Sequence, residues 1–85
     1  MGGNMTISKR KNIYNIIGSN IKMYRLEKHL TQHKLADMIP VSDSFVAKLE
    51  SITHQTISIE VLEKFADVLE KDLYLFFIDH SKDDN

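Results

Sequence analysis

The stretch from Thr31 to Glu50 limits the possible fold more than any other part of the chain. It reads TQHKLADMIPVSDSFVAKLE and contains two short helical patterns joined by a tight polar break. Gln32 opens the first pattern, and Ser42 is placed to cap the second. The apolar side chains of both patterns can face one small core: Leu35, Ile39, Val41, Val46 and Leu49. We therefore expect two short helices that pack together across a tight turn.

The second of these helices would carry its polar residues on the side opposite to the core. The outward positions are Asp43, Ser44, Ala47 and Lys48. A short helix displayed in this way is what a protein needs to read base edges in the major groove of DNA. Double-stranded DNA is therefore the leading candidate for a partner.

Apolar residues recur at three- and four-residue spacing in two further segments, which indicates amphipathic helices. In the first segment they are Ile13, Ile16, Ile17, Ile21 and Tyr24. In the second segment they are Ile59, Leu62, Phe65, Ala66 and Leu69. Each of these stripes is expected to face the interior of the protein.

Short polar side chains stand before each helical pattern from the second onward, where they can cap the first turn. These expected caps are Thr31, Ser42, Ser58 and Asp72. No segment shows the alternating pattern of a strand. The sequence thus predicts an all-α fold of five helices, over about 12–28, 32–39, 43–51 and 59–69, with a last short helix that ends near residue 78.

Eighty-five residues suit one compact domain. We divide the chain into a flexible basic arm over 1–11, a helical domain over 12–79 and a polar tail over 80–85. The lack of cysteine excludes disulfides and thiolate zinc sites, and is consistent with a reducing, cytoplasmic location. No apolar run approaches the roughly 20 residues that span a bilayer. No cofactor or small-molecule ligand is indicated, and no membrane association is expected.

Charge is divided unevenly along the chain, although the net charge is only −1. Residues 1–34 hold seven Lys or Arg against the single acid Glu27, a net charge of +6. Residues 35–85 hold four Lys against eleven acids, a net charge of −7. This division predicts one positive end that meets phosphates and one negative end that points away. The alternative is that these charges only form solvated surfaces.

The stretch from Ile17 to Phe77 resembles the lambda-repressor-like, Cro-type helix-turn-helix family, also called XRE. The similarity is carried by IGSNIKMYRLEKHLTQHKLADMI, by VSDSFVAKLES and by SIEVLEKFADVLEKDLYLFF. The resemblance implies a compact five-helix domain that regulates transcription, as a repressor or controller, by binding operator DNA as a symmetric homodimer. The length also resembles that of controller proteins of restriction–modification systems.

Three positions depart from the pattern of the family, which usually has glycine there. They are Pro40 in the turn of the motif, Ile52 after the third helix and Glu70 after the fourth. Proline cannot adopt the left-handed backbone angles that glycine supplies. The helix before Pro40 must therefore end in another way, which affects the tilt of the next helix.

By this resemblance, Asp43, Ser44, Ala47 and Lys48 correspond to base-contacting positions. Lys48 can donate to guanine O6 or N7, or to a phosphate, and Ala47 can contact a thymine methyl. Asp43 either accepts a hydrogen bond from cytosine N4 or is only a favourable charge at a helix N-terminus. Phe45 lies beside them, and either packs on DNA or closes the hydrophobic core.

Phosphate contacts are expected at both ends of the motif. Gln32 corresponds to a glutamine that binds phosphate at a helix N-terminus, and the alternative is an ordinary surface glutamine. The loop after the third helix is either a second phosphate-binding segment or a polar loop without a ligand. With Gln32, the candidate phosphate-binding residues are Lys22, Lys34, Ser42, Ser51, Thr53, His54, Gln55 and Ser58. The basic arm around Arg10 can add salt-sensitive affinity.

Two further sets of residues have structural roles in this interpretation. By the resemblance, Arg25 and Glu50 form an ion pair that fixes the third helix against the first. The last helix has five large apolar residues, more than one domain can bury: Leu73, Leu75, Phe76, Phe77 and Ile78. They predict a dimer interface that sets two recognition helices about 34 Å apart on a near-palindromic site. The alternative is that this helix only closes the monomer core.

An enzyme is not expected, because no motif for metal, phosphate or nucleophile chemistry is present. His29 and His33 have helical spacing, but a new helix should begin between them at Thr31. The competing function is a protein-binding module that keeps the fold, such as an antitoxin or an anti-repressor partner. Asp43, Pro40 and the nearly neutral net charge favour that alternative.

Overall fold

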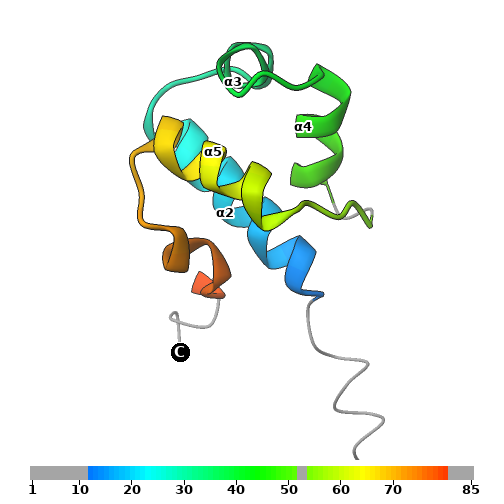
Figure 1. Cartoon of the computed structure of the whole chain (residues 1–85), viewed down its shortest axis with the longest axis vertical. Coiled ribbons are helices and arrows are strands. Elements are labelled where there is room, and N and C mark those ends of the chain that lie inside the picture. Colours follow the sequence, from blue (N-terminus) through cyan, green and yellow to red (C-terminus); the bar gives the residue numbers. More distant parts are fainter. Residues whose placement is uncertain (1–11, 52–53, 81–85) are drawn as a thin grey trace, which may run out of the picture.

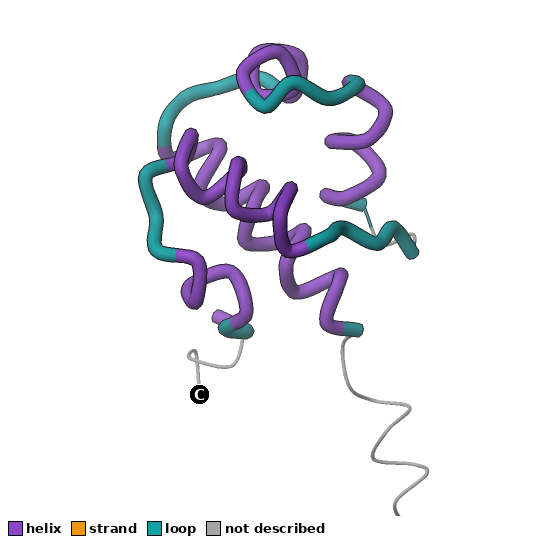
Figure 2. The backbone as a smooth tube through the Cα atoms, in the orientation of Figure 1, coloured by secondary structure: helices purple, strands orange, loops and turns teal. Residues whose placement is uncertain are grey.

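The structure, a computed structural model, describes residues 12–51 and 54–80. These residues form four α-helices and one 3-10 helix, and they contain no strand (Figures 1 and 2). In chain order the elements are α2 (Ile13–Glu27), α3 (Gln32–Met38), α4 (Asp43–Glu50), α5 (Ile59–Leu69) and η1 (Leu73–Phe77). The prediction of an all-α fold is confirmed, and the α-helices begin and end within one residue of the predicted limits.

Side-chain caps explain where the four α-helices begin, and at α2 the side-chain oxygen of Asn12 accepts a hydrogen bond from the backbone N–H of Tyr14 over 2.8 Å. The hydroxyl groups of Thr31, Ser42 and Ser58 each accept a hydrogen bond, at 3.0, 3.0 and 3.1 Å, from the backbone N–H three residues later. Each cap satisfies a donor that the first turn leaves unpaired. Asp72 precedes η1 but makes no side-chain cap hydrogen bond, so that predicted cap is wrong.

Helix α2 is the centre of the domain, since it packs against α4, α5 and η1. In Figure 1, α3 and α4 lie at one end and η1 at the other. The buried apolar residues come from every element: Ile17, Ile21, Tyr24, Leu35, Ala36, Ile39, Val46, Leu49, Ile57, Leu62, Phe65, Ala66, Leu69 and Phe76. One core therefore joins the two predicted amphipathic segments to the helical pair at Thr31–Glu50.

Four residues predicted to face the core do so only partly or not at all, and one of them, Ile16, is half-buried. Ile13 and Ile59 are 42% and 55% exposed. Each is the first residue of its helix, where the chain enters from the surface. Val41 lies in the turn and is half-buried against the core.

Two helices end without glycine because other residues adopt the left-handed conformation. His29 and Glu70 both have φ of 59°. The next residues close the ends, since Leu30 N–H donates to the Arg25 carbonyl and Lys71 N–H to that of Ala66, at 3.1 and 3.0 Å. These are Schellman closures, which usually contain glycine.

The turn of the motif also ends α3 without glycine. The backbone N–H of Val41 donates to the carbonyl of Ala36 over 2.8 Å, across Pro40. The peptide bond between Ile39 and Pro40 is cis. Helix α3 thus ends with Ile39 in the right-handed helical conformation and with a hydrogen bond that spans Pro40, without a left-handed residue.

Two residues of α2, Gly18 and Asn20, have structural roles that were not assigned from the sequence. A Cβ on Gly18 would collide with the carbonyl oxygen of Leu49, so the backbones of α2 and α4 touch at this glycine. Asn20 is buried, and its Nδ2 donates to the carbonyls of Phe76 and Ile78 over 2.8 and 2.9 Å. Gly18 therefore sets the separation of α2 and α4, while Asn20 holds η1 on α2.

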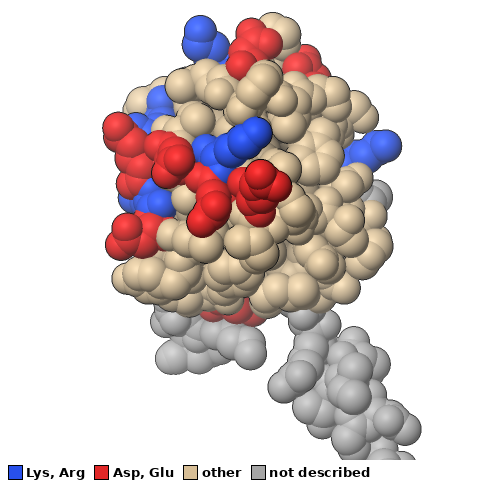
Figure 3. Space-filling view, in the orientation of Figure 1, with Lys and Arg blue, Asp and Glu red and all other residues tan. Residues whose placement is uncertain are grey.

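The predicted separation of charge into two ends is wrong for the described residues. Lys28 Nζ lies 2.6 Å from Glu70 Oε1, and Lys71 Nζ lies 3.2 Å from Glu27 Oε1. These pairs join the basic half of the sequence to the acidic half, and Figure 3 shows both charges side by side on one face. Folding brings α2 next to the end of α5, so separation along the chain does not persist in space.

Among the described helices, none is long and apolar enough to cross a membrane.

Candidate nucleic-acid interface

Helix α4 presents a polar outer side because its apolar side chains face the core. Val46 and Leu49 are 0% and 2% exposed. Asp43, Ser44 and Lys48 are exposed, and Ala47 is half-buried. The four sequence-predicted base-contacting residues therefore lie on the side of the helix that is turned away from the core.

Phe45 belongs to the edge of the core. Its side chain is half-buried and packs against the buried apolar residues. Its backbone N–H donates a hydrogen bond to the hydroxyl of Ser42, the N-cap residue of α4. This placement favours the alternative in which Phe45 closes the core.

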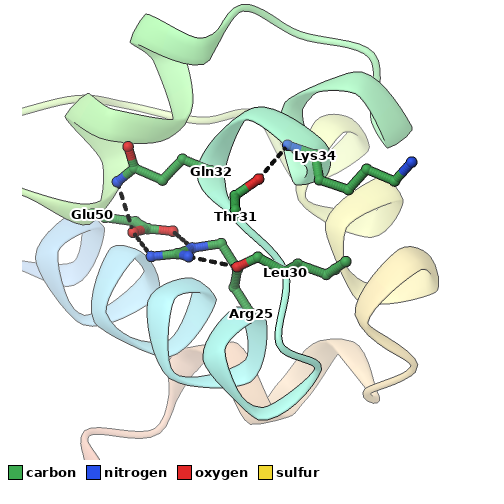
Figure 4. Close-up of polar contacts among 6 residues, drawn as sticks. All are labelled: Arg25, Leu30, Thr31, Gln32, Lys34 and Glu50. Atoms are coloured by element: carbon green, nitrogen blue, oxygen red, sulfur yellow. Dashed lines mark hydrogen bonds and ion pairs between the residues drawn. The ribbon is translucent and has the colours of Figure 1, made fainter.

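A buried ion pair fastens α4 to α2 (Figure 4). Arg25 Nε and a terminal nitrogen donate to the two carboxylate oxygens of Glu50 over 2.7 and 2.8 Å. The other terminal nitrogen of Arg25 donates to the carbonyl of Leu30 over 2.7 Å. The side chains of Arg25 and Glu50 are only 9% and 3% exposed. One guanidinium thus connects α2, the loop before α3 and the last residue of α4.

The charges of this pair suit their positions. Glu50 ends α4, where the helix dipole disfavours a negative charge, and the guanidinium of Arg25 offsets that effect. The hydrogen bond with Glu50 in turn raises the pKa of Arg25 above its usual value, against the opposing effect of burial. The bidentate geometry fixes orientation as well as distance. The position of α4 relative to α2 is therefore well determined.

Gln32 joins the same network from the start of α3. Its Nε2 donates to Glu50 Oε1 over 3.0 Å, and in Figure 4 its carbonyl oxygen points away from Glu50. A carboxamide nitrogen carries two N–H bonds, so one donor remains beyond the one used by Glu50. Gln32 is half-buried at a helix N-terminus, where a phosphate is electrostatically favoured.

His33 contacts Asp43, one of the candidate base-contacting residues, and this contact was not predicted from the sequence. Its Nδ1 lies 2.8 Å from Oδ2 of Asp43, and its Nε2 lies 3.6 Å from Oδ2 of Asp37. The hydrogen bond to Asp43, together with the charges of both carboxylates, raises the pKa of His33 above its ordinary value. The spacing of His33 and Asp37 is helical, but no sequence pattern linked either residue to Asp43.

The other candidate phosphate-binding residues are partly occupied by local hydrogen bonds. The hydroxyl groups of Ser42 and Ser58 cap helices, and Ser51 Oγ donates to the carbonyl of Lys48 over 3.0 Å. Gln55 Nε2 donates to the carbonyl of Thr56 over 2.9 Å. These bonds organise the ends of α4 and α5.

Lys22, Lys34 and His54 are exposed on three different segments. Lys22 follows Gly18 by four residues on α2, which places it on the side of α2 that meets α4. The His54 ring lies edge-on to Tyr14, with ring centroids 5.7 Å apart. Thr53, Ile52 and the basic arm lie outside the described residues.

The last segment divides into buried and exposed residues. Phe76 is fully buried, and Leu73 and Leu75 are half-buried against the core. Phe77 and Ile78 are 37% and 38% exposed. Burial of Phe76 means that η1 closes the monomer core, while Phe77 and Ile78 leave an apolar surface beside it.

The helix-turn-helix family matches residues 21–76, which is more than half of the chain. The chain belongs to this XRE-type helix-turn-helix family. The match covers α3, α4 and α5 completely and reaches Phe76 in η1. The family agrees with the expectation that the chain is not an enzyme, since SinR, a similar structure, is described as a master regulator. The comparison with curated protein sequences gives no match.

Solved structures of regulators have the same fold. SinR, described as a master regulator for biofilm formation and solved in complex with DNA, is 32% identical over 73% of this chain and 98% of its own, with a TM-score of 0.69. The N-terminal DNA-binding domain of SinR from Bacillus subtilis is 31% identical over 75% of this chain and 93% of its own, with a TM-score of 0.70. ClgR, the clp gene regulator from C. glutamicum, is 20% identical over 87% of this chain and 95% of its own, with a TM-score of 0.76. This last likeness concerns the fold alone.

Proposed function

We propose that this chain is a transcription regulator that binds double-stranded DNA through the outer side of α4. The observation that carries this proposal is the polar face of α4, which the buried Arg25–Glu50 pair holds in a fixed position. The family and the likeness to SinR, which was solved with DNA, support it. A preorganised helix loses little conformational freedom when it enters the major groove.

The exposed residues of α4 have different roles in this proposal. Lys48 donates to guanine or to a phosphate, and Ser44 either donates or accepts at a base edge. Ala47 approaches a thymine methyl. Gln32 donates its second N–H to a phosphate at the N-terminus of α3. Lys22 and Lys34 add sequence-independent affinity, because each neutralised phosphate releases counterions.

Replacing Lys48 with alanine is expected to weaken specific DNA binding by about 1–3 kcal/mol. The reason is the loss of a cation from the exposed side of α4, with no loss of core packing. Operator fragments are first selected from a random duplex library. Fluorescence anisotropy with a selected fragment then gives the affinity of each variant.

Lys64→Ala is the matched control, because it removes the same charge from an exposed position on α5. We expect this control to change the affinity much less than Lys48→Ala. Circular dichroism establishes that both variants fold. Equal affinities of the wild type and Lys48→Ala would contradict the role of Lys48.

We further propose that the chain acts as a homodimer on a near-palindromic operator, as a repressor or controller. The apolar surface at the end of η1 supports this, since Phe77 and Ile78 are exposed and Ile78 lines a hollow together with Ile16 and Met23. Exposed apolar surface of this kind is typical of a self-complementary interface. A symmetric dimer would match the two half-sites of a near-palindromic operator.

The double variant Phe77→Ser and Ile78→Ser is expected to shift the protein from dimer to monomer in sedimentation velocity. It removes exposed apolar surface but leaves the buried Phe76 in place. Truncation before Leu73 would be a poorer test, because it also removes Phe76 from the core. Met38→Ser, at a position that is 46% exposed on α3, is the control. If the double variant remained dimeric at a concentration at which the wild type is dimeric, this interface would be refuted.

A protein-binding module is the second candidate function. SinR has also been solved as a SinR–SinI protein complex, and that structure is 30% identical over 79% of this chain and 65% of its own. Asp37 and Asp43 add negative charge to the helix-turn-helix surface, which suits a basic protein better than DNA. Salt titration of binding to mixed-sequence DNA separates the two functions, because DNA binding weakens steeply with salt.

A further inference from the structure

The imidazole of His33 lies between two carboxylates from the two helices of the motif. Its Nδ1 is 2.8 Å from Asp43, the first residue of α4, and its Nε2 is 3.6 Å from Asp37, one turn along α3. The three side chains are each more than half exposed, at 70%, 59% and 65% for His33, Asp43 and Asp37. This trio therefore lies at the surface beside the outer side of α4.

We propose that protonated His33 is a positioning residue that neutralises and orients Asp43, so that the start of α4 can approach DNA. This inference rests on the proposed DNA-binding function. Two carboxylates near the phosphates would repel them, and one imidazolium between the carboxylates reduces that repulsion. The hydrogen bond also engages one oxygen of Asp43 and leaves the other oxygen to accept from a cytosine N4.

The geometry suits the charged form of the ring. A neutral imidazole has one N–H and can donate to one carboxylate, whereas an imidazolium has two N–H groups. Nδ1 of His33 lies within hydrogen-bond distance of Asp43, at 2.8 Å, and Nε2 lies 3.6 Å from the carboxylate of Asp37, close enough for an ion pair. An imidazolium is therefore the form that interacts favourably with both.

The surrounding charges act in the same direction. The hydrogen bond to Asp43, then its charge and that of Asp37, raise the pKa of His33, and they outweigh the opposing effects of burial and of Lys34. Glu50, the other carboxylate of α4, is already bound to Arg25 and Gln32. The proton is thus held to a higher pH than on an isolated histidine, and it is lost as the pH rises through this raised pKa.

DNA affinity should therefore fall as the pH rises above the ordinary range of histidine. One proton is involved, so the decrease is expected to be about threefold to tenfold over the transition and at most about tenfold per pH unit. Asp43→Asn should also weaken the dependence of DNA affinity on pH, because it changes the partner of His33 and not His33 itself. That substitution removes the carboxylate that repels phosphate and also removes the main cause of the raised pKa of His33.

The test measures binding of the full chain to a fluorescent mixed-sequence duplex at constant low salt, between about pH 5.5 and about pH 8.5. His33→Gln keeps a donor near Asp43 but cannot gain a proton, so its affinity should vary little across this range. His29→Asn is the matched control, since asparagine tolerates the left-handed backbone at that exposed position. The DNA affinity of His29→Asn should depend on pH as that of the wild type does. NMR titration of the His33 ring should show a pKa that falls in Asp43→Asn.

Loss of the pH dependence in His33→Gln, with its retention in His29→Asn, would support the proposal. The same dependence in His33→Gln as in the wild type would overturn it. A wild-type affinity that is salt-sensitive but independent of pH would also overturn it, while leaving DNA binding intact. Failure to bind DNA at any pH, even at low salt, would instead refute the proposed function and this inference with it.

Discussion

Glu50→Ala is expected to lower the free energy of unfolding by about 3–5 kcal/mol, because it leaves the guanidinium of Arg25 buried without its charge partner. The carboxylate of Glu50 accepts two hydrogen bonds from Arg25 and one from Gln32, and its side chain is 3% exposed. A loss of this size is a large share of the roughly 5–15 kcal/mol that stabilises a typical domain. Urea denaturation followed by circular dichroism measures it.

Two matched variants separate this effect from a general loss of charge. Lys28→Ala removes a partner of the Lys28–Glu70 pair, which is exposed, and should change the stability much less. The double variant Arg25→Met and Glu50→Leu replaces both charges with apolar side chains and should recover much of the loss. If Glu50→Ala proved as stable as Lys28→Ala, the buried pair would not be what fastens α4 to α2.

The helices could be predicted because their signals are local. Thr31, Ser42 and Ser58 each stand directly before an apolar pattern, and a hydroxyl at that position caps the backbone N–H three residues later. Apolar spacing then identifies the side that is buried. The exposed Ile13 and Ile59 show the limit of this reasoning, because periodicity alone does not tell where the surrounding core ends.

The contacts that organise the candidate site could be predicted only where the family resemblance pointed to them. Arg25 and Glu50 are 25 residues apart, and only the likeness to the family suggested that they meet. The contact of His33 with Asp43 depends on the angle between α3 and α4, which no spacing in the sequence encodes. The burial of Asn20 could have been predicted from the sequence, since it is a polar residue three positions after Ile17 within an apolar stripe.

Gly18→Ala is expected to lower the free energy of unfolding by at least about 2 kcal/mol, although alanine is normally the better residue in a helix. A Cβ at this position would collide with the carbonyl oxygen of Leu49 and lie 2.7 Å from its carbonyl carbon. Both are backbone atoms of α4, so no side-chain rotation can relieve the collision. Helix α4 would have to move away from α2, which would also strain the bonds between Arg25 and Glu50.

Ser19→Ala is the matched control, because it introduces the same residue at the next, exposed position of α2. There the gain in helix propensity should leave the stability unchanged or raise it slightly, by about 0.5 kcal/mol or less. Gly18→Ala should therefore unfold at a lower urea concentration than the wild type, and Ser19→Ala at the same or a slightly higher concentration. A Gly18→Ala protein that is as stable as Ser19→Ala would show that α2 and α4 do not touch at this glycine. The DNA affinity of the folded fraction then tests whether this contact also sets the position of α4.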